Sequence, residues 1–127
     1  LEDTLVLVCH GSPGSQTAGF DKALEPGIAF ERIARTDARV IACGHTHVPE
    51  IRDFGFKVLV NDGSAGYVFD GDPTASWAMV DIFEGEVTAE IKREEFDTLA
   101  VSNALTARGL PGDVYRAATV RTGKVVR

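Results

Sequence analysis

Apolar runs alternate with polar segments in the first third of the chain. Residues 4–9 and 39–43 are rich in valine, leucine and isoleucine, a pattern that predicts two buried strands. Between them, Pro26 suits the first position of a helix that extends to about residue 35. Strand, helix and strand in this order predict a βαβ unit with parallel strands, the first of them central in its sheet.

The helical periodicity between the two strands identifies the face that we expect to be buried. Ile28, Ala29 and Ile33, together with Phe30, fall on one side of a helix, whereas Glu31 and the neighbouring arginines fall on the other. We therefore expect the first group to pack against the sheet.

The pattern changes after residue 49. Residues 50–54 and 56–61 read as antiparallel strands around a glycine, and residues 76–83 and 86–93 read as a hairpin around a Glu-Gly turn. In the second arm of that hairpin apolar and polar residues alternate, so we expect one of its faces to be exposed to water.

The sequence pattern near the end of the chain again predicts helices. Asp97 is a suitable N-cap for a helix that extends to about residue 108 and stops at a glycine. Val101, Ala104 and Leu105 would form its buried stripe. Residues 114–127 predict a short helix followed by a basic end.

Composition restricts the classes of function. The chain has 127 residues, 44% of them hydrophobic and 25% charged, as in an ordinary globular domain. A net charge of −6 argues against binding to nucleic acid or to an anionic membrane. No apolar run approaches the roughly 20 residues of a membrane-spanning helix, and no signal peptide is evident, so we expect a cytoplasmic protein.

All three histidines of the chain directly follow an apolar run. His10 comes after the first predicted strand, and His45 and His47 come after the second, beyond Gly44. Because the carboxyl ends of parallel strands lie at the same edge of a sheet, we expect the three imidazoles to converge there. Imidazole is the commonest protein ligand for transition metals, so the pattern predicts a metal site rather than three unrelated surface side chains.

Spacing alone leaves the kind of metal site open. Three imidazoles are also the ligand set of a mononuclear catalytic zinc site. Against that alternative, no carboxylate is obviously placed to orient the rings, with Asp62 and Asp53 the nearest candidates. The two cysteines, Cys9 and Cys43, lie inside predicted strands, where we expect small core side chains rather than a disulfide or metal ligands.

At Gly44-His45-Thr46-His47 the chain resembles the calcineurin-like metallophosphoesterases, in particular the small bacterial and archaeal phosphodiesterase branch. The strand that ends in His10-Gly11 is similar to the preceding ligand motif of that family. Residues 60–66 are similar to its Asn-Pro-Gly-Ser loop, with Asp62 in place of proline, and residues 70–78 are similar to its hairpin entry. These motifs occur in the order of the family and extend over essentially the whole chain.

The resemblance also implies that part of the domain is missing. The family carries three earlier motifs, Asp-x-His, Gly-Asp-x-x-Asp and Gly-Asn-His, and none precedes His10. The chain starts at Leu1 without methionine, and its first strand follows almost at once. We therefore expect residues 1–127 to be a single partial domain, the C-terminal half of the α/β/β/α sandwich, with a βαβ unit, then three or four antiparallel strands of the second sheet, then a C-terminal helix.

The resemblance implies a dinuclear, metal-dependent phosphoesterase acting on phosphomonoesters or phosphodiesters. His10 and His45 would bind one divalent ion and His47 the other, with Mn, Fe, Ni or Zn as candidate metals. In the family, a hydroxide that bridges the two ions attacks phosphorus. Asn61 and Ser64 would line the phosphate side, although both residue types also simply form turns. No catalytic residue other than the metal ligands is assignable, because the histidine that protonates the leaving group belongs to a missing motif.

Two alternatives of different classes remain. The chain would be inactive alone if its other half is absent, and would then act as a binding or assembly half-domain, either as a homo-oligomer or by complementation with the missing N-terminal half. An unpaired strand edge favours such association. The mononuclear three-histidine zinc hydrolase is the other alternative. The identity of the phosphate-ester substrate is not encoded in these residues.

Overall fold

One four-stranded sheet carries both histidine-bearing strands. The computed structural model describes residues 3–127, and its sheet has the order β1 (Val6–Val8), β2 (Val40–Cys43), β4 (Val58–Asn61) and β3 (Glu50–Asp53). β1 and β2 are parallel neighbours, as predicted for the βαβ unit. β3 and β4 are antiparallel to each other, which confirms the predicted pair around Gly55.

The division of strands between the sheets differs from the prediction. β4 lies parallel to β2 in the first sheet and brings β3 with it, so only two strands are left for the second sheet. The physical reason is the Val58-Leu59-Val60 run, which is buried on both faces and suits a central parallel strand. β1 is instead an edge strand within the described residues, and Val8 is 77% exposed, so the expectation of a central first strand was wrong.

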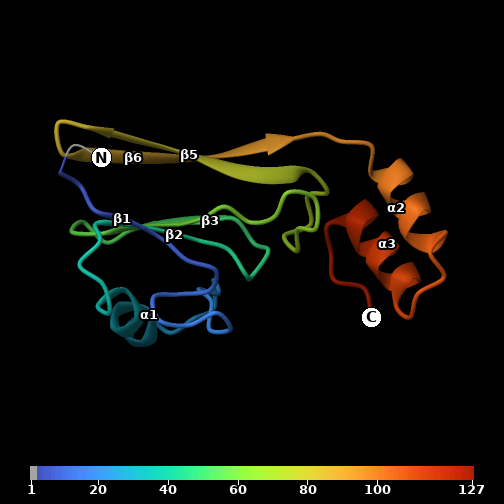
Figure 1. Ribbon diagram of the computed structural model, residues 1–127, viewed down its shortest axis with the longest axis horizontal. Helices are drawn as coiled ribbons and strands as arrows, with labels where there is room; N and C mark the ends of the chain where they lie inside the picture. Colours follow the sequence, from blue (N-terminus) through green and yellow to red (C-terminus); the bar gives the residue numbers. More distant parts are fainter. Residues whose placement is uncertain (1–2) are drawn as a thin grey trace.

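Helix α1 (Pro26–Ile33) covers one face of this sheet (Figure 1). Pro26 occupies its first turn as predicted, and the Glu25 carboxylate accepts a hydrogen bond from Gly27 N. Ala29 and Ile33 are buried as predicted. Ile28 and Phe30 are exposed, so the prediction that they face the sheet was wrong. The core between helix and sheet consists of Phe20, Ala29, Ile33, Ile41, Cys43 and Leu59.

The predicted hairpin forms a second layer on the opposite face of the sheet (Figure 1). Its strands are β5 (Ala75–Phe83) and β6 (Glu86–Glu94), paired from Ala75 with Glu94 to Phe83 with Glu86. Alternate residues such as Val80 and Ala89 are half-buried toward the sheet, while the polar residues of β6 face water as predicted. The result is a layered α/β arrangement of helix, sheet and hairpin.

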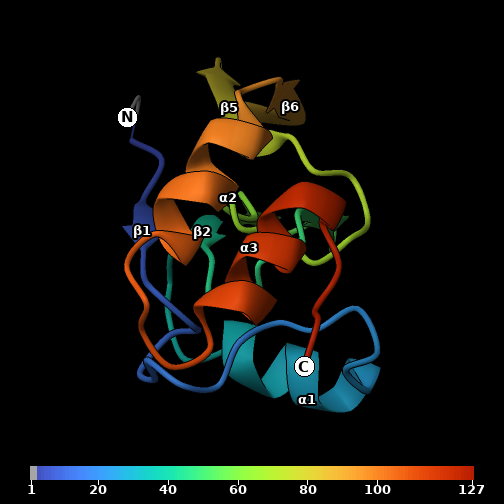
Figure 2. The same cartoon turned by 90° about the vertical axis from the view of Figure 1, so that its right-hand side faces the viewer.

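Two helices follow the hairpin, as the patterns over residues 97–108 and 114–127 predicted. α2 (Thr98–Thr106) and α3 (Asp113–Thr122) pack against each other and stand at the end of the sheet, as Figure 2 shows. Asp97 caps α2 as predicted, since its carboxylate accepts a hydrogen bond from Ala100 N at 2.8 Å. The predicted buried stripe was wrong for Val101 and Ala104, which are exposed, whereas Leu105 is half-buried. Ser102 is the buried residue of α2, which packs on α3.

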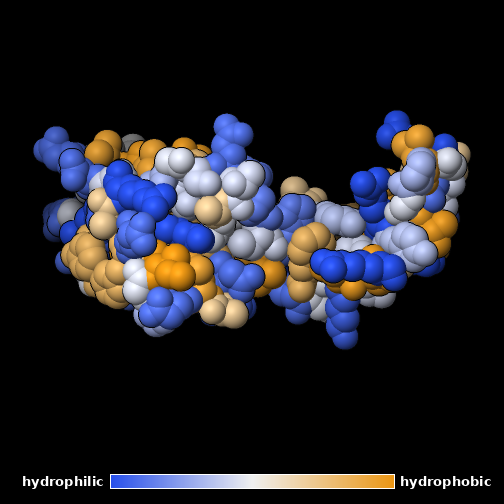
Figure 3. Space-filling view, turned by 90° about the horizontal axis from the view of Figure 1, so that it is seen from below, coloured by the Kyte–Doolittle hydropathy of each residue, from blue (hydrophilic) through white to orange (hydrophobic). Residues whose placement is uncertain are grey.

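Seen from the side of α1, the molecule has a larger part formed by the sheets and a smaller part formed by the two helices, with a narrower middle (Figure 3). Gly71 N donates a hydrogen bond to Gly123 O at 2.8 Å, which fastens the end of α3 to the 70–74 turn. Within residues 3–127, no helix combines the length and the apolar character needed to cross a bilayer.

Arg93 fastens the same turn to β6. Its guanidinium bonds to the Asp70 carboxylate at 2.7 Å, to Thr74 Oγ1 at 2.7 Å and to Asp72 O at 2.6 Å. Burial alone would raise the pKa of the Asp70 carboxyl, but hydrogen bonds from Arg93 and from Asp72 N outweigh it and hold that pKa below its ordinary value of 3.8. The carboxylate therefore contributes to folding in its charged form.

We predict that Asp70→Asn lowers the free energy of unfolding by about 0.5–1 kcal/mol at pH 7, because Asp70 is an exposed residue and solvent screens its carboxylate. Because the folded-state pKa is lowered, this contribution is fully present above the ordinary carboxyl pKa and is lost as the pH falls through the folded value. Urea denaturation of both proteins between pH 7 and 3 measures it, and the two curves should converge at acidic pH. The exposed Asp81→Asn on β5 is the control, and a difference that persists unchanged at pH 3 would contradict the assignment.

Candidate metal centre

Parallel pairing of β1 and β2 continues past the ends of both strands and brings two histidines together. Val8 aligns with Ala42 in the sheet, and beyond them Gly44 N donates a hydrogen bond to His10 O at 2.9 Å. His45 Nδ1 then lies 3.1 Å from His10 Nε2, and the two rings meet edge to face with centroids 5.0 Å apart. The predicted convergence at one sheet edge is therefore observed for this pair.

The backbone of the His-Thr-His segment sends its two rings in different directions. His45 and His47 both adopt left-handed conformations, with φ of 70° and 58°. Such conformations cost a non-glycine residue about 1–3 kcal/mol and cluster at functional sites. Between them, Thr46 N donates to Gly44 O at 2.8 Å and closes a tight turn. Within this segment the backbone strain is thus confined to His45 and His47, the two residues whose rings are candidate metal ligands.

His47 is fixed by an aromatic pocket of its own. Its ring stacks on Phe69 with centroids 4.7 Å apart and meets Tyr67 edge to face at 5.7 Å. Its Nδ1 lies 2.6 Å from the backbone oxygen of Tyr67, an atom that only accepts hydrogen bonds, so Nδ1 carries the proton. The lone pair of this ring is consequently on Nε2. A histidine whose other ring nitrogen donates to a backbone carbonyl is the usual arrangement of a metal ligand.

The contact between His10 and His45 also suits a shared ion. Each metal–nitrogen bond is about 2.0–2.1 Å long. When the angle between two such bonds lies between a right angle and the tetrahedral angle, the two nitrogens are about 2.9–3.4 Å apart. The observed 3.1 Å between the facing nitrogens is within that range. Both rings reach this geometry from strands of one sheet. Gly19 leaves room for the His45 ring, because a Cβ there would approach His45 Cδ2 to 3.0 Å.

Three histidines do not form a single ligand cluster. Among residues 3–127, no group of three or more His, Cys, Asp and Glu side chains is close enough to hold a metal ion. The arrangement is a pair, His10 with His45, and a separately oriented His47 two residues further along. It therefore gives no support to the mononuclear three-histidine zinc site.

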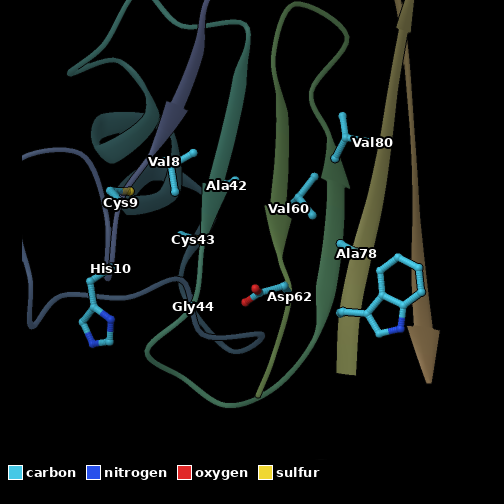
Figure 4. Close-up of a pocket in the computed structure, with 11 residues that line it drawn as sticks. Val8, Cys9, His10, Ala42, Cys43, Gly44, Val60, Asp62, Ala78 and Val80 are labelled. Atoms are coloured by element: carbon cyan, nitrogen blue, oxygen red, sulfur yellow. The ribbon is translucent and has the colours of Figure 1, made fainter. Parts of the chain in front are cut away.

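The two nearby carboxylates differ in position. Asp53 accepts a hydrogen bond from Gly55 N and shapes the turn between β3 and β4, away from the histidines. Asp62 is exposed and points toward Gly44, opposite His10, at the mouth of a cavity of about 380 Å³ between the sheet and β5 (Figure 4). The apolar wall of that cavity is formed by Val8, Ala42, Val60, Trp77, Ala78 and Val80.

Asn61 and Ser64 hold the loops that carry the site. Asn61 is fully buried, and its amide donates to Gly44 O at 3.2 Å and to Thr46 Oγ1 at 2.7 Å while its oxygen accepts from Gly63 N at 3.0 Å. Ser64 Oγ accepts from Tyr67 N at 3.1 Å. Both side chains therefore act on loop geometry, the turn-forming role left open by the sequence.

The cysteines behave as core residues. Cys43 is 5% exposed within the core cluster, Cys9 packs against that cluster, and both are free thiols. Burial, with smaller contributions from nearby acidic groups, raises the pKa of the Cys43 thiol to about 12. A thiol of this kind stays protonated and is a poor metal ligand.

Sequence reasoning missed three residues that surround the histidines. Tyr67 and Phe69 fix the His47 ring, and their only sequence signal is an alternating aromatic pair after a glycine loop. Ser12 lies beside His10 in the 10–16 loop and is 1% exposed, with a buried hydroxyl that has no hydrogen-bond partner within the described part of the chain.

Comparisons with known proteins show which proteins this chain is similar to. A family model described as the calcineurin-like phosphoesterase superfamily domain matches residues 1–85. The solved structure of a metallophosphoesterase from Sphaerobacter thermophilus is 26% identical, with a TM-score of 0.71, over 93% of this chain and 57% of that one.

A hypothetical protein from Pyrococcus horikoshii OT3 shares the fold, with a TM-score of 0.70 and 20% identity over 93% of this chain and 46% of that one. The chain therefore spans about half the length of the solved structures that it matches. The comparison with curated proteins gives no match.

We predict that Asn61→Ala lowers the free energy of unfolding by about 2–4 kcal/mol, because it leaves buried loop groups without partners. Its effect should concentrate on the 44–47 loop, where backbone amide exchange would accelerate more than in α1. The exposed Asn103→Ala on α2 is the matched control and should change stability by less than about 0.5 kcal/mol. Equal losses in the two variants would show that Asn61 does not hold the histidine loop.

Proposed function

The chain belongs to the calcineurin-like phosphoesterase superfamily, and we propose that it supplies His10, His45 and His47 as metal ligands of a dinuclear phosphoesterase. The observation that carries the proposal is the 2.6 Å contact of the Tyr67 backbone oxygen with the ring of His47. Its Nδ1 donates to the Tyr67 carbonyl and leaves Nε2 free for an ion. The 3.1 Å approach of His10 and His45 supports a second ion shared by those two rings.

The reaction proposed for the whole domain is hydrolysis of a phosphomonoester or phosphodiester. When bound, two divalent ions supply positive charge for the phosphoryl oxygens and lower the pKa of an attacking water. Manganese, iron, nickel and zinc all suit imidazole with carboxylate ligands. With a chain net charge of −6, these ions would be the main attraction for an anionic ester.

The residues of this chain have positioning roles in that reaction. Asn61 holds Gly44 and Thr46, and so fixes the turn from which His45 and His47 diverge. Phe69 stacks on His47 and limits the rotation of its ring. Asp62, at the same edge, is the carboxylate of this chain best placed to complete the ligand set or to orient a bound water. No residue here is assigned as the acid for the leaving group.

A second function, association with a complementary polypeptide, is supported by the exposed apolar surface. Val8 at the end of β1 and Trp77 on β5 both line the cavity in Figure 4 and are 77% and 39% exposed, and Met79 and Phe83 on β5 are 43% and 67% exposed. A two-stranded sheet is marginally stable by itself. We propose that a further half of the domain packs here and adds the ligands that the chain lacks.

We predict that His45→Gly weakens binding of manganese and zinc by about tenfold or more, yet leaves the unliganded protein as stable as before or stabilises it by up to about 1 kcal/mol. Glycine relieves the positive φ while it removes a ligand. Calorimetric metal titration and urea denaturation measure the two effects separately, and dialysis against a chelator should reverse the metal binding.

Glu84→Gly is the matched control, because Glu84 also has a positive φ, of 48°, in the β5–β6 turn. It should relieve comparable strain without any effect on metal affinity. If His45→Gly binds both metals as tightly as the parent chain, His45 is not a ligand.

We further predict weak or undetectable hydrolysis of bis(p-nitrophenyl) phosphate by the 127-residue chain alone with manganese. Addition of a polypeptide that carries the three earlier family motifs should raise turnover and form a stoichiometric complex. Val8→Lys should weaken that complex by tenfold or more, because it places a charge in the apolar contact. A tenfold loss of affinity corresponds to about 1.4 kcal/mol of binding free energy.

Phe56→Lys is the control, because Phe56 is also exposed, at 57%, but lies in the β3–β4 turn. Light scattering with sedimentation distinguishes a complex with the added polypeptide from self-association. Rapid manganese-dependent turnover by a monomer of the chain alone would refute the need for a second half.

A further inference from the structure

A second hollow lies between the glycine loop that follows β4 and the helical pair. It is lined by residues 64–67, by Phe96 before α2, by Val101 on α2 and by Val120 on α3, and its volume is about 410 Å³. None of the lining side chains is charged. This composition differs from the histidine edge and favours an uncharged, mainly apolar group.

The hollow adjoins the proposed metal site through Tyr67. The backbone oxygen of Tyr67 holds His47 Nδ1 at 2.6 Å, and its ring lies 5.7 Å from the His47 ring. Tyr67 is also part of the wall of the hollow. Tyr67 therefore borders both the hollow and the ring of His47.

The backbone keeps an aromatic ring close to the loop. Gly66 has a φ of 143°, and a Cβ at this position would lie 3.3 Å from Phe96 Cζ. Phe96 thus lies directly over the loop, on the wall that Tyr67 shares. Two aromatic residues in the lining, Tyr67 and Phe96, suit a planar ring as the occupant.

We propose that this hollow binds a planar aromatic group of the substrate, such as a nucleobase or aryl ring, while the ester phosphate lies toward His47. The assignment to a substrate rests on the proposed phosphoesterase function. The absence of a cationic side chain among the lining residues means that the phosphate itself has no counter-charge in the hollow. The hollow would therefore select the organic part of the ester, which favours nucleotidyl or aryl esters over small alkyl ones.

The test uses neutral probes that need neither metal nor phosphate. Adenosine and phenol are titrated into the ¹⁵N-labelled 127-residue chain without metal, with ribose and methanol as non-aromatic counterparts. We expect the aromatic probes to shift the backbone amides of residues 64–67, 96 and 101, and the non-aromatic probes to leave them unchanged. Val101→Glu should weaken aromatic binding about fivefold or more, because a carboxylate would enter the apolar wall.

Leu99→Glu is the matched control on the same helix. Leu99 is 57% exposed and does not line the hollow, so this variant carries the same charge change and should bind the probes as the parent chain does. Circular dichroism verifies that both variants keep the helical pair. Val101 is itself 40% exposed, so its replacement is compatible with folding.

The outcomes separate this inference from the proposed reaction. If adenosine leaves residues 64–67 and 101 unshifted, or if the two glutamate variants bind it equally, the hollow is not an aromatic subsite, whatever the metal titrations give. If adenosine binds there but neither manganese nor zinc binds at the histidines, the subsite stands and the phosphoesterase function fails.

Discussion

Pairing between β1 and β2 is the interaction on which the rest of this structure depends. The ladder does not stop at the strand ends, because Cys9 N bonds to Ala42 O and Gly44 N bonds to His10 O, each at 2.9 Å. A register slip of one residue would turn His10 away from His45 and would move the buried side chains of β2 to the wrong face. The core beneath, with Ile41 and Leu59 buried against α1, therefore fixes the register that brings two imidazole rings within 3.1 Å.

A second constraint acts beyond the strands, in the His45-Thr46-His47 turn. Left-handed conformations at both His45 and His47 are unfavourable by themselves, so the turn needs support from its surroundings. Asn61 provides it from the neighbouring strand β4 with hydrogen bonds to Gly44 O and Thr46 Oγ1, and the Tyr67 carbonyl provides it at His47. Asn61 is fully buried in a strand that is otherwise valine and leucine. A polar side chain in that position is costly unless it makes such bonds, which explains why it is asparagine rather than another apolar residue.

The sequence predicted those parts of the fold that local patterns determine, and it failed where a distant partner decides. Pro26, Asp97 and the Glu84-Gly85 turn each act within a few residues, and α1, α2 and the hairpin were placed correctly from them. The assignment of β4 to the first sheet, and the exposure of Val8, Ile28 and Val101, depend on which surfaces meet in three dimensions. The same holds for the site: the histidines were visible from their positions after apolar runs, whereas the contribution of Tyr67 is a backbone oxygen, which any residue type carries.

The position of the helical pair connects these constraints to substrate choice. α2 and α3 pack mainly against each other. The C-terminal end of α3 is attached by the Gly71–Gly123 hydrogen bond to the 70–74 turn, which Arg93 holds. That attachment places Phe96 and Val101 over residues 64–67 without filling the space between them. Residues 64–67 also present the carbonyl that orients His47, the proposed metal ligand, so a ring bound in the hollow would contact the same loop. Occupancy of the hollow and orientation of His47 are therefore expected to be coupled, and this coupling requires no contact between the bound ring and the ions.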